Sequence, residues 1–302
     1  DPFSAVEENG LLFGRGSADM KSAIGAFISA AVNYITENKP NGSIVIAITG
    51  DEEGEAKDGT VAILDWMKKN NEKIDHCLVG EPTSRESLGD TIKIGRRGSL
   101  TAKITALGIQ GHVAYPEKAI NPLPALTELL LKLQGRPLDK GNTFFDPSSF
   151  AITSIDTGNP SNNVIPEKGE ATINIRFNDF HSDVSLTGWL RKNIAKITDK
   201  TGVKMELELK VSARPFISKP GNFADIIAKS VQAQTKTFPS ISTSGGTSDA
   251  RFIQEYCPVV EFGLVGKTMH QIDEHVEIRQ IMDLSNIYYK ILKSYFSKLG
   301  KN

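Results

Sequence analysis

The first third of the chain alternates between helical and continuous apolar patterns. Apolar residues recur at helical spacing over Asp19–Asn38 and Thr60–Asn70. Between these segments, residues 43–49 (SIVIAIT) form an apolar, β-branched run, and residues 76–82 (HCLVGEP) contain a shorter one. Such runs are typical of strands that are covered on both faces of a sheet. We therefore predict a strand over residues 43–49, a short strand that ends at Glu81, and helices around them.

The pattern changes after Gly98, where polar and apolar residues begin to alternate. This alternation is typical of antiparallel strands with one solvated face. Two helical segments, Pro122–Leu133 and Asp183–Thr198, lie among the alternating ones. The alternating segments are residues 99–108, 150–158, 169–179 and 204–211.

The helix–strand pattern of the first part returns after Ser212. The segments predicted there are a helix over Asn222–Gln234, a strand over Val259–Val265 and a helix over Glu277–Lys298. The simplest interpretation is an α/β domain with a doubly wound mixed sheet, formed by residues 1–98 plus 213–302. An α+β domain, residues 99–212, is inserted into it and has an ordinary domain size.

Composition limits the classes of partner. The net charge is −1 and the pI about 6.6, so no basic field predicts binding to nucleic acid or to an anionic membrane surface. No apolar run approaches the roughly 20 residues of a spanning helix. The two cysteines, Cys77 and Cys257, lie in apolar surroundings, which favours buried thiols of a cytoplasmic protein over a disulfide framework.

Acidic residues follow the predicted strands. Asp51, Glu52 and Glu53 come directly after residues 43–49, and Glu81 ends the next strand. Ligand sites in doubly wound sheets collect beyond the carboxyl ends of strands. Adjacent carboxylates repel one another, so a metal ion or a raised pKa would be needed to hold them together. Helix capping and solubility are the other explanation, and this pattern alone leaves both open.

Two further segments favour a metal site. Residues 14–20 (GRGSADM) and 268–275 (TMHQIDEH) place an acid or a histidine where a loop meets a helix or turn. Carboxylate oxygens together with imidazole nitrogens suit Zn²⁺, Mn²⁺ or Co²⁺. We therefore predict a divalent metal site built from segments far apart in the chain.

A set of motifs in fixed order identifies a family. They are GRGSADMKS, ITGDEEG, GEPT, GRRGS, GIQGHVAYP, SNNVIP, GGTSDARF and TMHQIDEHV. In this order they resemble the dinuclear zinc deacylases and exopeptidases, and the resemblance extends over essentially the whole chain. It implies a catalytic α/β domain interrupted by a lid domain through which two subunits form a homodimer.

The resemblance also implies roles for individual residues. Asp19 corresponds to the carboxylate that bridges two metals, Glu53 and His270 to the other ligands of one metal, and Glu81 to a ligand of the second. Glu52 corresponds to the general base. The cofactor implied is two Zn²⁺ per subunit in the complete protein, with Co²⁺ or Mn²⁺ as alternatives. The peptide bond between Asp19 and Met20 is expected to be cis.

One departure from the family pattern concerns the second metal. The family has a further ligand histidine in an H-x-D motif upstream of the bridging carboxylate, but all five histidines here follow Asp19. We expect the natural protein to be longer. On this expectation, this chain can build the metal site of Asp19, Glu53 and His270 but only part of the second metal site, at Asp19 and Glu81. We would then expect it to bind one metal weakly and to be inactive.

The resemblance implies a succinylated amino-acid substrate that carries several carboxylates, which arginine side chains bind well. By resemblance, His112 reaches the metals of the partner subunit as a catalytic residue. The residues that face substrate by resemblance are Arg96, Ser99, Tyr115, Asn163, Arg176, Gly246 and Thr247. A solvated or ion-paired side chain is the plain alternative for any one of these arginines.

The reaction that the resemblance favours is hydrolysis of N-succinyl-LL-2,6-diaminopimelate to succinate and LL-2,6-diaminopimelate, a step of lysine and diaminopimelate biosynthesis. GIQGHVAYP and GGTSDARF favour this substrate. Acetylornithine or another N-acyl amino acid is the alternative, because GRRGS and SNNVIP are shared more widely. A dimeric fragment without catalytic activity is a third possibility, of a different class.

Overall fold

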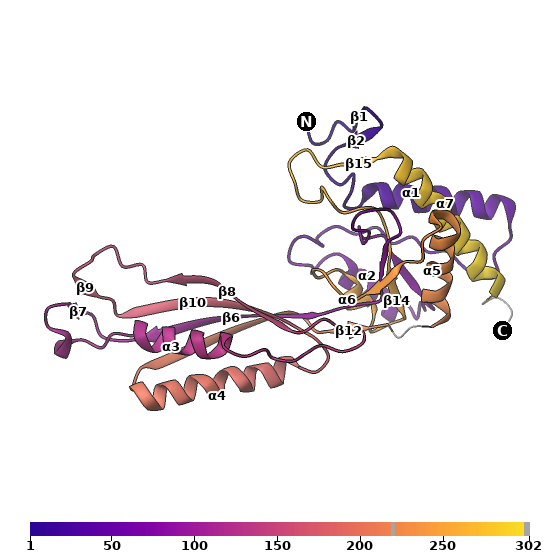
Figure 1. Cartoon of the computed structure of the whole chain (residues 1–302). Helices are drawn as coiled ribbons and strands as arrows, with labels where there is room; N and C mark the ends of the chain where they lie inside the picture. The colour runs from indigo at the N-terminus through magenta and orange to yellow at the C-terminus, as the bar shows by residue number, and fades with distance from the viewer. Residues whose placement is uncertain (219–220, 299–302) are drawn as a thin grey trace. The chain divides into compact units, whose positions relative to one another are not determined.

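The computed structural model describes residues 1–218 and 221–298 and contains two compact units (Figure 1). Unit 1 consists of Asp1–Gly95, Ile217–Thr243 and Ser248–Asn302, and unit 2 consists of Arg96–Phe216 and Ser244–Thr247. The assignment of residues 1–98 plus 213–302 to catalysis and of 99–212 to dimerisation stays a prediction. Within the described ranges, no helix combines the length and the apolar character needed to cross a membrane.

Unit 1 contains a mixed four-stranded sheet. The order is β13-β4-β14-β3, with parallel pairing of β13 to β4 and of β14 to β3, and antiparallel pairing of β14 to β4. The mixed sheet of the predicted α/β class is thereby confirmed. The strands are β3 (Cys77–Val79), β4 (Thr91–Lys93), β13 (Ser240–Ser242) and β14 (Val259–Glu261).

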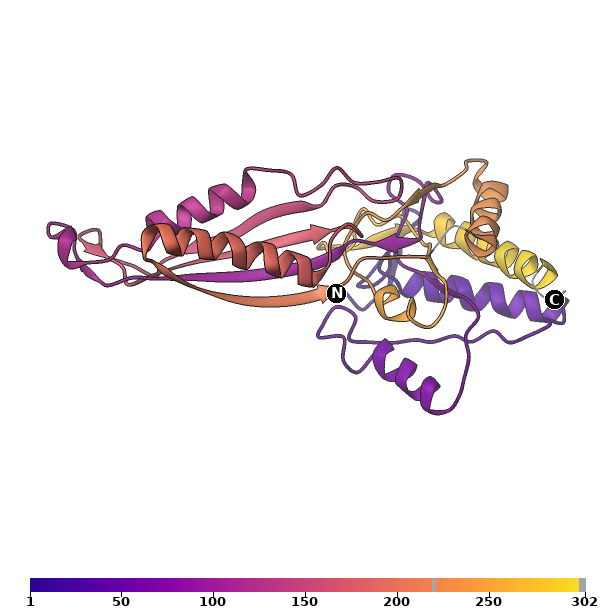
Figure 2. The same ribbon diagram turned by 90° about the horizontal axis from the view of Figure 1, so that it is seen from below.

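Three helices pack together with this sheet. Side chains of α1, α5 and α7 share one core with Ile92 of β4 and Val260 of β14, and α1 and α7 run side by side in both views (Figures 1 and 2). The buried Tyr288 of α7 donates a hydrogen bond to the carbonyl of Phe262 at 2.8 Å. The predicted helices of this unit are confirmed as α1 (Lys21–Glu37), α2 (Thr60–Lys69), α5 (Asn222–Thr235) and α7 (Ile278–Lys298), and a short α6 (Ala250–Ile253) is added.

A second, small sheet in unit 1 was not predicted. Its order is β1-β2-β15, formed by Val6–Glu8, Leu11–Phe13 and His275–Glu277. The antiparallel pairing of β2 with β15 aligns Phe13 with His275. Directly beyond this pair, the amide of Gly14 donates to the carbonyl of Glu274 at 2.9 Å. The sheet thereby holds the chain after Phe13 next to the chain before His275.

The strand predicted over residues 43–49 is wrong. These residues belong to no helix or strand of the described part of the chain, and Val45 is 72% exposed. An apolar, β-branched run sets the local preference, but a strand also requires a neighbour to receive its backbone hydrogen bonds. The strand predicted over Val259–Val265 is also shorter than expected, because β14 ends at Glu261.

Unit 2 is an antiparallel sheet covered by two helices. The order is β11-β6-β10-β8, and α3 (Leu123–Gln134) and α4 (Asp183–Thr201) lie along one face (Figure 2). The strands are β6 (Gly98–Leu107), β8 (Ser149–Asp156), β10 (Lys168–Phe177) and β11 (Lys204–Ala213), which confirms the four alternating segments. The shorter elements are β5 (Gly95–Arg96), β7 (Gly111–His112), β9 (Val164–Ile165), β12 (Phe216–Ile217) and the 3₁₀ helix Pro116–Lys118.

The carboxylate of Asp139 connects several loop segments of unit 2 through hydrogen bonds. Asp139 accepts hydrogen bonds from the amide of Gly141 at 2.7 Å and from the side-chain amide of Asn178 at 2.6 Å. Nε2 of His181 lies 3.1 Å from its Oδ2. Although burial opposes ionisation, hydrogen bonds from Ser148, Gly141 and Asn178 lower the pKa of Asp139 to about 2.

This pKa predicts how acid affects unit 2. A carboxyl group whose pKa is about 2 when folded and about 3.9 when unfolded stabilises the fold above pH 4 and loses this contribution as the pH falls to 2. We expect Asp139→Asn to reduce the free energy of unfolding by about 2 kcal/mol at pH 5 and by far less at pH 2. Urea titrations followed by Trp189 fluorescence in a Trp66→Phe background measure it. Asp156→Asn, at an exposed position of the same unit, is the control, and an equal loss at both pH values would contradict the prediction.

Candidate metal centre and active site

Three predicted ligands converge in unit 1. Nε2 of His270 lies 2.8 Å from Oε1 of Glu53 and 3.2 Å from Oδ2 of Asp19. One ligand atom from each of the three residues lies within 4.8 Å of the other two. The residues that supply them are as much as 251 positions apart in the chain, so the fold rather than local sequence assembles this group.

Asp19 and His270 each lie in a loop next to a helix or a strand. Asp19 precedes α1, and its peptide bond to Met20 is cis, as predicted. The turn before it requires a glycine, because Gly16 has a φ of +87° and an added Cβ would lie 2.8 Å from the Lys21 side chain. His270 belongs to the loop between β14 and β15, which Thr268 closes by donating from Oγ1 to the carbonyl of His275 at 2.6 Å.

The three adjacent acids have different surroundings. Asp51 stabilises its own loop by accepting hydrogen bonds from the amides of Glu55 at 3.1 Å and Lys57 at 2.7 Å. Glu53 extends to His270. Glu52 is half-buried, and burial together with the negative charges of Glu53 and Asp249 raises its pKa to about 7. A carboxyl group with such a pKa suits proton transfer near neutral pH.

The donor set fits a divalent cation. Two carboxylates and one imidazole are ordinary zinc ligands. Burial and the neighbouring charge of Glu53 raise the pKa of Asp19, while the hydrogen bond and the charge of Glu53 raise the pKa of His270. A cation between the three groups would relieve the repulsion of the carboxylates and coordinate the imidazole nitrogen. Glu81, which follows β3, does not belong to this group of ligand atoms and stays a predicted ligand.

Two neighbouring acids were not predicted to belong to the site. Glu274 is 3% exposed and accepts a hydrogen bond from the amide of Asp19 at 2.9 Å. Asp249 is 7% exposed, accepts a hydrogen bond from Thr60 at 2.6 Å, and acts on Glu52 through its charge. Both lie within quoted motifs, GGTSDARF and TMHQIDEHV, but the sequence does not distinguish Glu274 from the equally acidic, exposed Asp273 beside it.

Some predicted substrate residues gather at the start of β6 in unit 2. Arg176 of β10 pairs with Ser99 of β6 in the antiparallel register, and its side chain is half-buried. Nη1 of Arg96 donates to the carbonyl of Gly246 at 2.8 Å, which places the loop of Gly246 and Thr247 beside β5. Arg176 and Ser99 therefore lie opposite each other on neighbouring strands, and Arg96 holds the Gly246 loop close to the start of β6, an arrangement that suits a site that binds carboxylates.

The other predicted residues lie at the far end of the same strands. The ring of His112 lies 5.9 Å from that of Tyr115, and the amide of Val113 donates to the carbonyl of Asn163 at 3.1 Å. His112 and Tyr115 follow β6, whose ten residues span about 30 Å, and Asn163 is held beside them by Val113. Within unit 2, they therefore do not share a substrate pocket with Arg96, Ser99 and Arg176.

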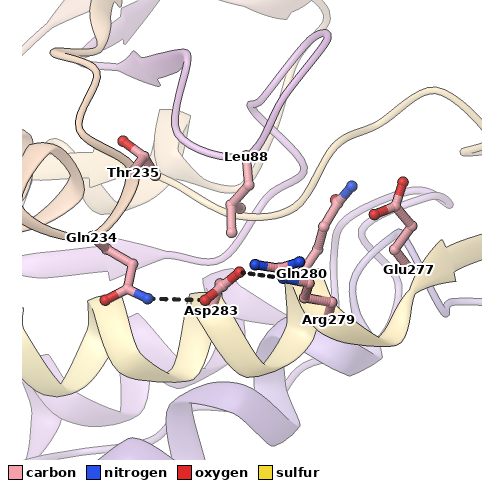
Figure 3. Close-up of a pocket in the computed structure, with 7 residues that line it drawn as sticks. All are labelled: Leu88, Gln234, Thr235, Glu277, Arg279, Gln280 and Asp283. Carbon is pink, nitrogen blue, oxygen red and sulfur yellow. Dashed lines mark hydrogen bonds and ion pairs between the residues drawn. The ribbon is translucent and has the colours of Figure 1, made fainter. Parts of the chain in front are cut away.

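A separate hollow of about 340 Å³ lies elsewhere in unit 1 (Figure 3). Its polar groups bind one another: Nε2 of Gln234 donates to Asp283 at 2.9 Å, and Nε of Arg279 lies 3.9 Å from the same carboxylate. It is lined by Leu88, Gln234, Thr235, Glu277, Arg279, Gln280 and Asp283. None of the predicted site residues contributes to it, so it is not the candidate active site.

Comparison with known proteins defines the class. The model of peptidase family M20/M25/M40 matches residues 1–294, so the chain belongs to this family. Among the curated relatives are two named succinyl-diaminopimelate desuccinylase. The protein of Cereibacter sphaeroides strain KD131 is 54% identical over 297 residues, which cover 98% of this chain and 78% of that protein. The protein of Ruegeria pomeroyi is 52% identical over 296 residues with the same coverage.

Solved structures share the fold at low sequence identity. Aminopeptidase PepT from Bacillus cereus is 16% identical with a TM-score of 0.79, over 97% of this chain and 76% of that one. The M20 metallo-carboxypeptidase Sso-CP2 from Sulfolobus solfataricus is 17% identical with a TM-score of 0.70, over 98% of this chain and 80% of that one. At this identity the likeness concerns the fold, and it confirms the predicted α/β class with an insertion.

Proposed function

We propose that this chain is a metal-dependent amide hydrolase that converts N-succinyl-LL-2,6-diaminopimelate and water into succinate and LL-2,6-diaminopimelate. The observation that carries the proposal is the convergence of Asp19, Glu53 and His270, with Glu52 beside them, in a member of the M20 family. The name shared by relatives at 51–54% identity supports the substrate and its place in lysine and diaminopimelate biosynthesis.

Zinc is the proposed metal, held by Asp19, Glu53 and His270. A second zinc would bind between Asp19 and Glu81 in the complete site, and cobalt or manganese are alternatives that the same donors accept. Bound zinc supplies a Lewis acid that polarises the amide carbonyl and makes water more acidic. Family membership supports the dependence on metal, whereas the identity and number of the ions belong to the proposal.

The side chains of this chain supply proton transfer and orientation. Glu52 takes a proton from the attacking water and passes it to the nitrogen of the departing amine. Arg96 and Arg176 bind carboxylates of the substrate, with Ser99 as a hydroxyl donor, because guanidinium groups match carboxylates in shape and charge. Thr247 and the backbone of Gly246 contact the substrate from the loop that Arg96 holds.

A homodimer formed through unit 2 is part of the proposal. His112, Tyr115 and Asn163 lie about 30 Å along β6 from the arginine group, so a second subunit is required to bring both groups to one substrate. The same end of unit 2 exposes apolar side chains suited to burial in an interface, namely Ile109, Val113, Tyr115 and Ile120. In such a dimer His112 stabilises the developing negative charge on the substrate carbonyl of the partner.

Hydrolysis measured on matched substrates tests the proposed function. With zinc added, we expect measurable hydrolysis of N-succinyl-LL-2,6-diaminopimelate even though the H-x-D histidine is absent from this sequence, with kcat/KM at least about tenfold above that for N-acetylornithine, because arginine side chains favour the additional carboxylates. Succinate release, followed by mass spectrometry at stoichiometric enzyme, detects even slow turnover. Preference for acetylornithine would identify an acetylornithine deacetylase-like enzyme, and a zinc-loaded dimer that hydrolyses neither would support the non-catalytic alternative.

The cytoplasm is the proposed location, in keeping with two unpaired cysteines, of which Cys257 is buried.

A further inference from the structure

We propose that Glu274 is a positioning residue that fixes the distance between the two ligand-bearing loops, residues 14–20 and 268–275. The inference rests on the proposed metal site but concerns a residue to which neither the motif resemblance nor the family match assigns a role. Its basis is a set of hydrogen bonds that join Glu274 to four consecutive or nearly consecutive positions about 255 residues earlier in the chain.

Both carboxylate oxygens of Glu274 are engaged by the turn before α1. Oε1 accepts hydrogen bonds from the amides of Ala18 and Asp19, each at 2.9 Å. Oε2 accepts from the amide of Gly16 at 3.0 Å and from Nη1 of Arg15 at 2.7 Å. The turn therefore surrounds one carboxylate with three backbone donors and one cation.

This carboxylate is fixed on the histidine side as well. Glu274 lies in the loop that carries His270, and that loop is closed at its base by two hydrogen bonds between Thr268 and His275. Arg15 adds a second link, because its Nη2 donates to the carbonyl of Gln271 at 3.1 Å. Glu274 therefore connects the backbone of one metal ligand to the loop of another.

A carboxylate is the group that this arrangement requires. The four donors are N–H groups, so both oxygens must accept, and only an ionised acid offers two acceptors without a donor. A glutamine in the same place would direct its NH₂ group at N–H donors, and buried amides would lose their partners. A shared carboxylate with no direct role in coordination can still control metal affinity by fixing where ligands point.

A purely stabilising role is the competing explanation, and Asp139 provides the matched comparison. It too is a buried carboxylate that accepts several N–H groups, but it lies in unit 2, which contains none of the proposed metal ligands. Replacement of either acid removes a similar set of hydrogen bonds. Only replacement of Glu274 would change the metal centre if our inference is right.

The first measurement needs no metal. In Glu274→Gln, hydrogen exchange at the amides of Gly16, Ala18 and Asp19 should be at least about tenfold faster than in the wild type, because these amides lose their acceptor. In Asp139→Asn, exchange at the same amides should be unchanged. Unchanged exchange in Glu274→Gln would show that the carboxylate does not hold the turn, and would overturn the inference.

The second measurement is zinc affinity, by competition with a chromogenic chelator at pH 7.5. We expect Glu274→Gln to raise the Kd by about 10- to 100-fold, and Glu274→Asp, which keeps the charge, to restore part of the affinity. Asp139→Asn should stay within about twofold of the wild type. A change in the visible spectrum of the cobalt-loaded Glu274→Gln protein would report altered ligand geometry directly.

The outcomes separate the inference from the proposed function. Zinc bound with wild-type affinity by a folded Glu274→Gln protein would overturn the positioning role and leave the metal site intact. A wild-type chain that binds no zinc would overturn both. If Glu274→Gln does not fold, Arg15→Ala gives the decisive result, since Arg15 is partly exposed and its loss removes one donor from the carboxylate and the link to Gln271. We expect a several-fold weaker affinity for it, and wild-type affinity would contradict the inference.

Discussion

Replacing Glu52 with glutamine is expected to slow hydrolysis of the succinylated substrate by about 10²- to 10⁴-fold while zinc stays bound. This is the usual contribution of a positioned general base, and glutamine keeps the size of the side chain but cannot take up a proton. Glu52 lies outside the group of three ligand atoms, so the loss should appear in kcat rather than in metal content. Single-turnover rates and zinc content, measured on the same protein sample, test this result.

Glu55→Gln is the matched control for that variant. Glu55 lies in the same loop and is exposed, with Lys57 as its partner, so its replacement should leave the rate within about twofold. Loss of zinc from Glu52→Gln would instead identify Glu52 as a ligand. An unchanged rate with zinc retained would exclude it as the base.

The same variant also tests the proposed dimer. Mixing Glu52→Gln with His112→Ala should restore activity, because a mixed dimer contains one site with Glu52 from one subunit and His112 from the other. Random exchange of subunits places one intact site in half of the dimers, so about a quarter of the wild-type activity is expected. Absence of any recovery, after exchange is verified by mass spectrometry, would exclude a site shared between subunits.

Replacing His270 with alanine is expected to weaken zinc binding by more than about 100-fold. Removing a residue that hydrogen-bonds to a metal ligand typically lowers metal affinity by about 10- to 100-fold. Removing the ligand itself should lower the affinity further. His270 supplies the nitrogen donor of the group, so the remaining Asp19 and Glu53 would offer only oxygen atoms. Chelator competition and thermal unfolding with and without zinc measure the change, since a bound ligand raises the stability of the protein that binds it.

His275→Ala distinguishes loss of a ligand from disturbance of the loop. His275 lies in the same loop, and its ring packs 4.9 Å from that of Phe13, outside the group of ligand atoms. Its replacement should reduce stability but leave the zinc Kd within about twofold. An equal loss of affinity in both variants would mean that loop order, and not the imidazole of His270, determines binding.

Local pattern predicted the helices and the antiparallel strands well because each is determined by nearby residues. The alternation in residues 99–108 and 169–179 is the alternation of buried and exposed positions in β6 and β10. The strand over residues 43–49 failed because pairing depends on a neighbour that local pattern does not contain. The three-residue strands β1, β2 and β15 are too short for periodicity to appear.

The candidate site was predicted through motifs rather than through periodicity. Asp19, Glu53 and His270 belong to motifs, and the fold brings them together. Glu274 and Asp249 also lie in motifs but were not assigned to the site, because an acid that accepts hydrogen bonds from distant groups looks, in sequence, like any other acid. Their importance depends on amides, a guanidinium group and a hydroxyl that lie up to 259 positions away, and only the folded chain shows this.

The unpaired apolar segment over residues 43–49 also bears on how this chain behaves at high concentration. Val45, Ile46 and Ile48 are exposed, β-branched and free of charge, and this combination is typical of segments that add to a strand of another molecule. Self-association through this segment would compete with any functional dimer. Its nearest charged neighbours in sequence, Lys39 and Asp51, lie outside the apolar run and do little to prevent such stacking.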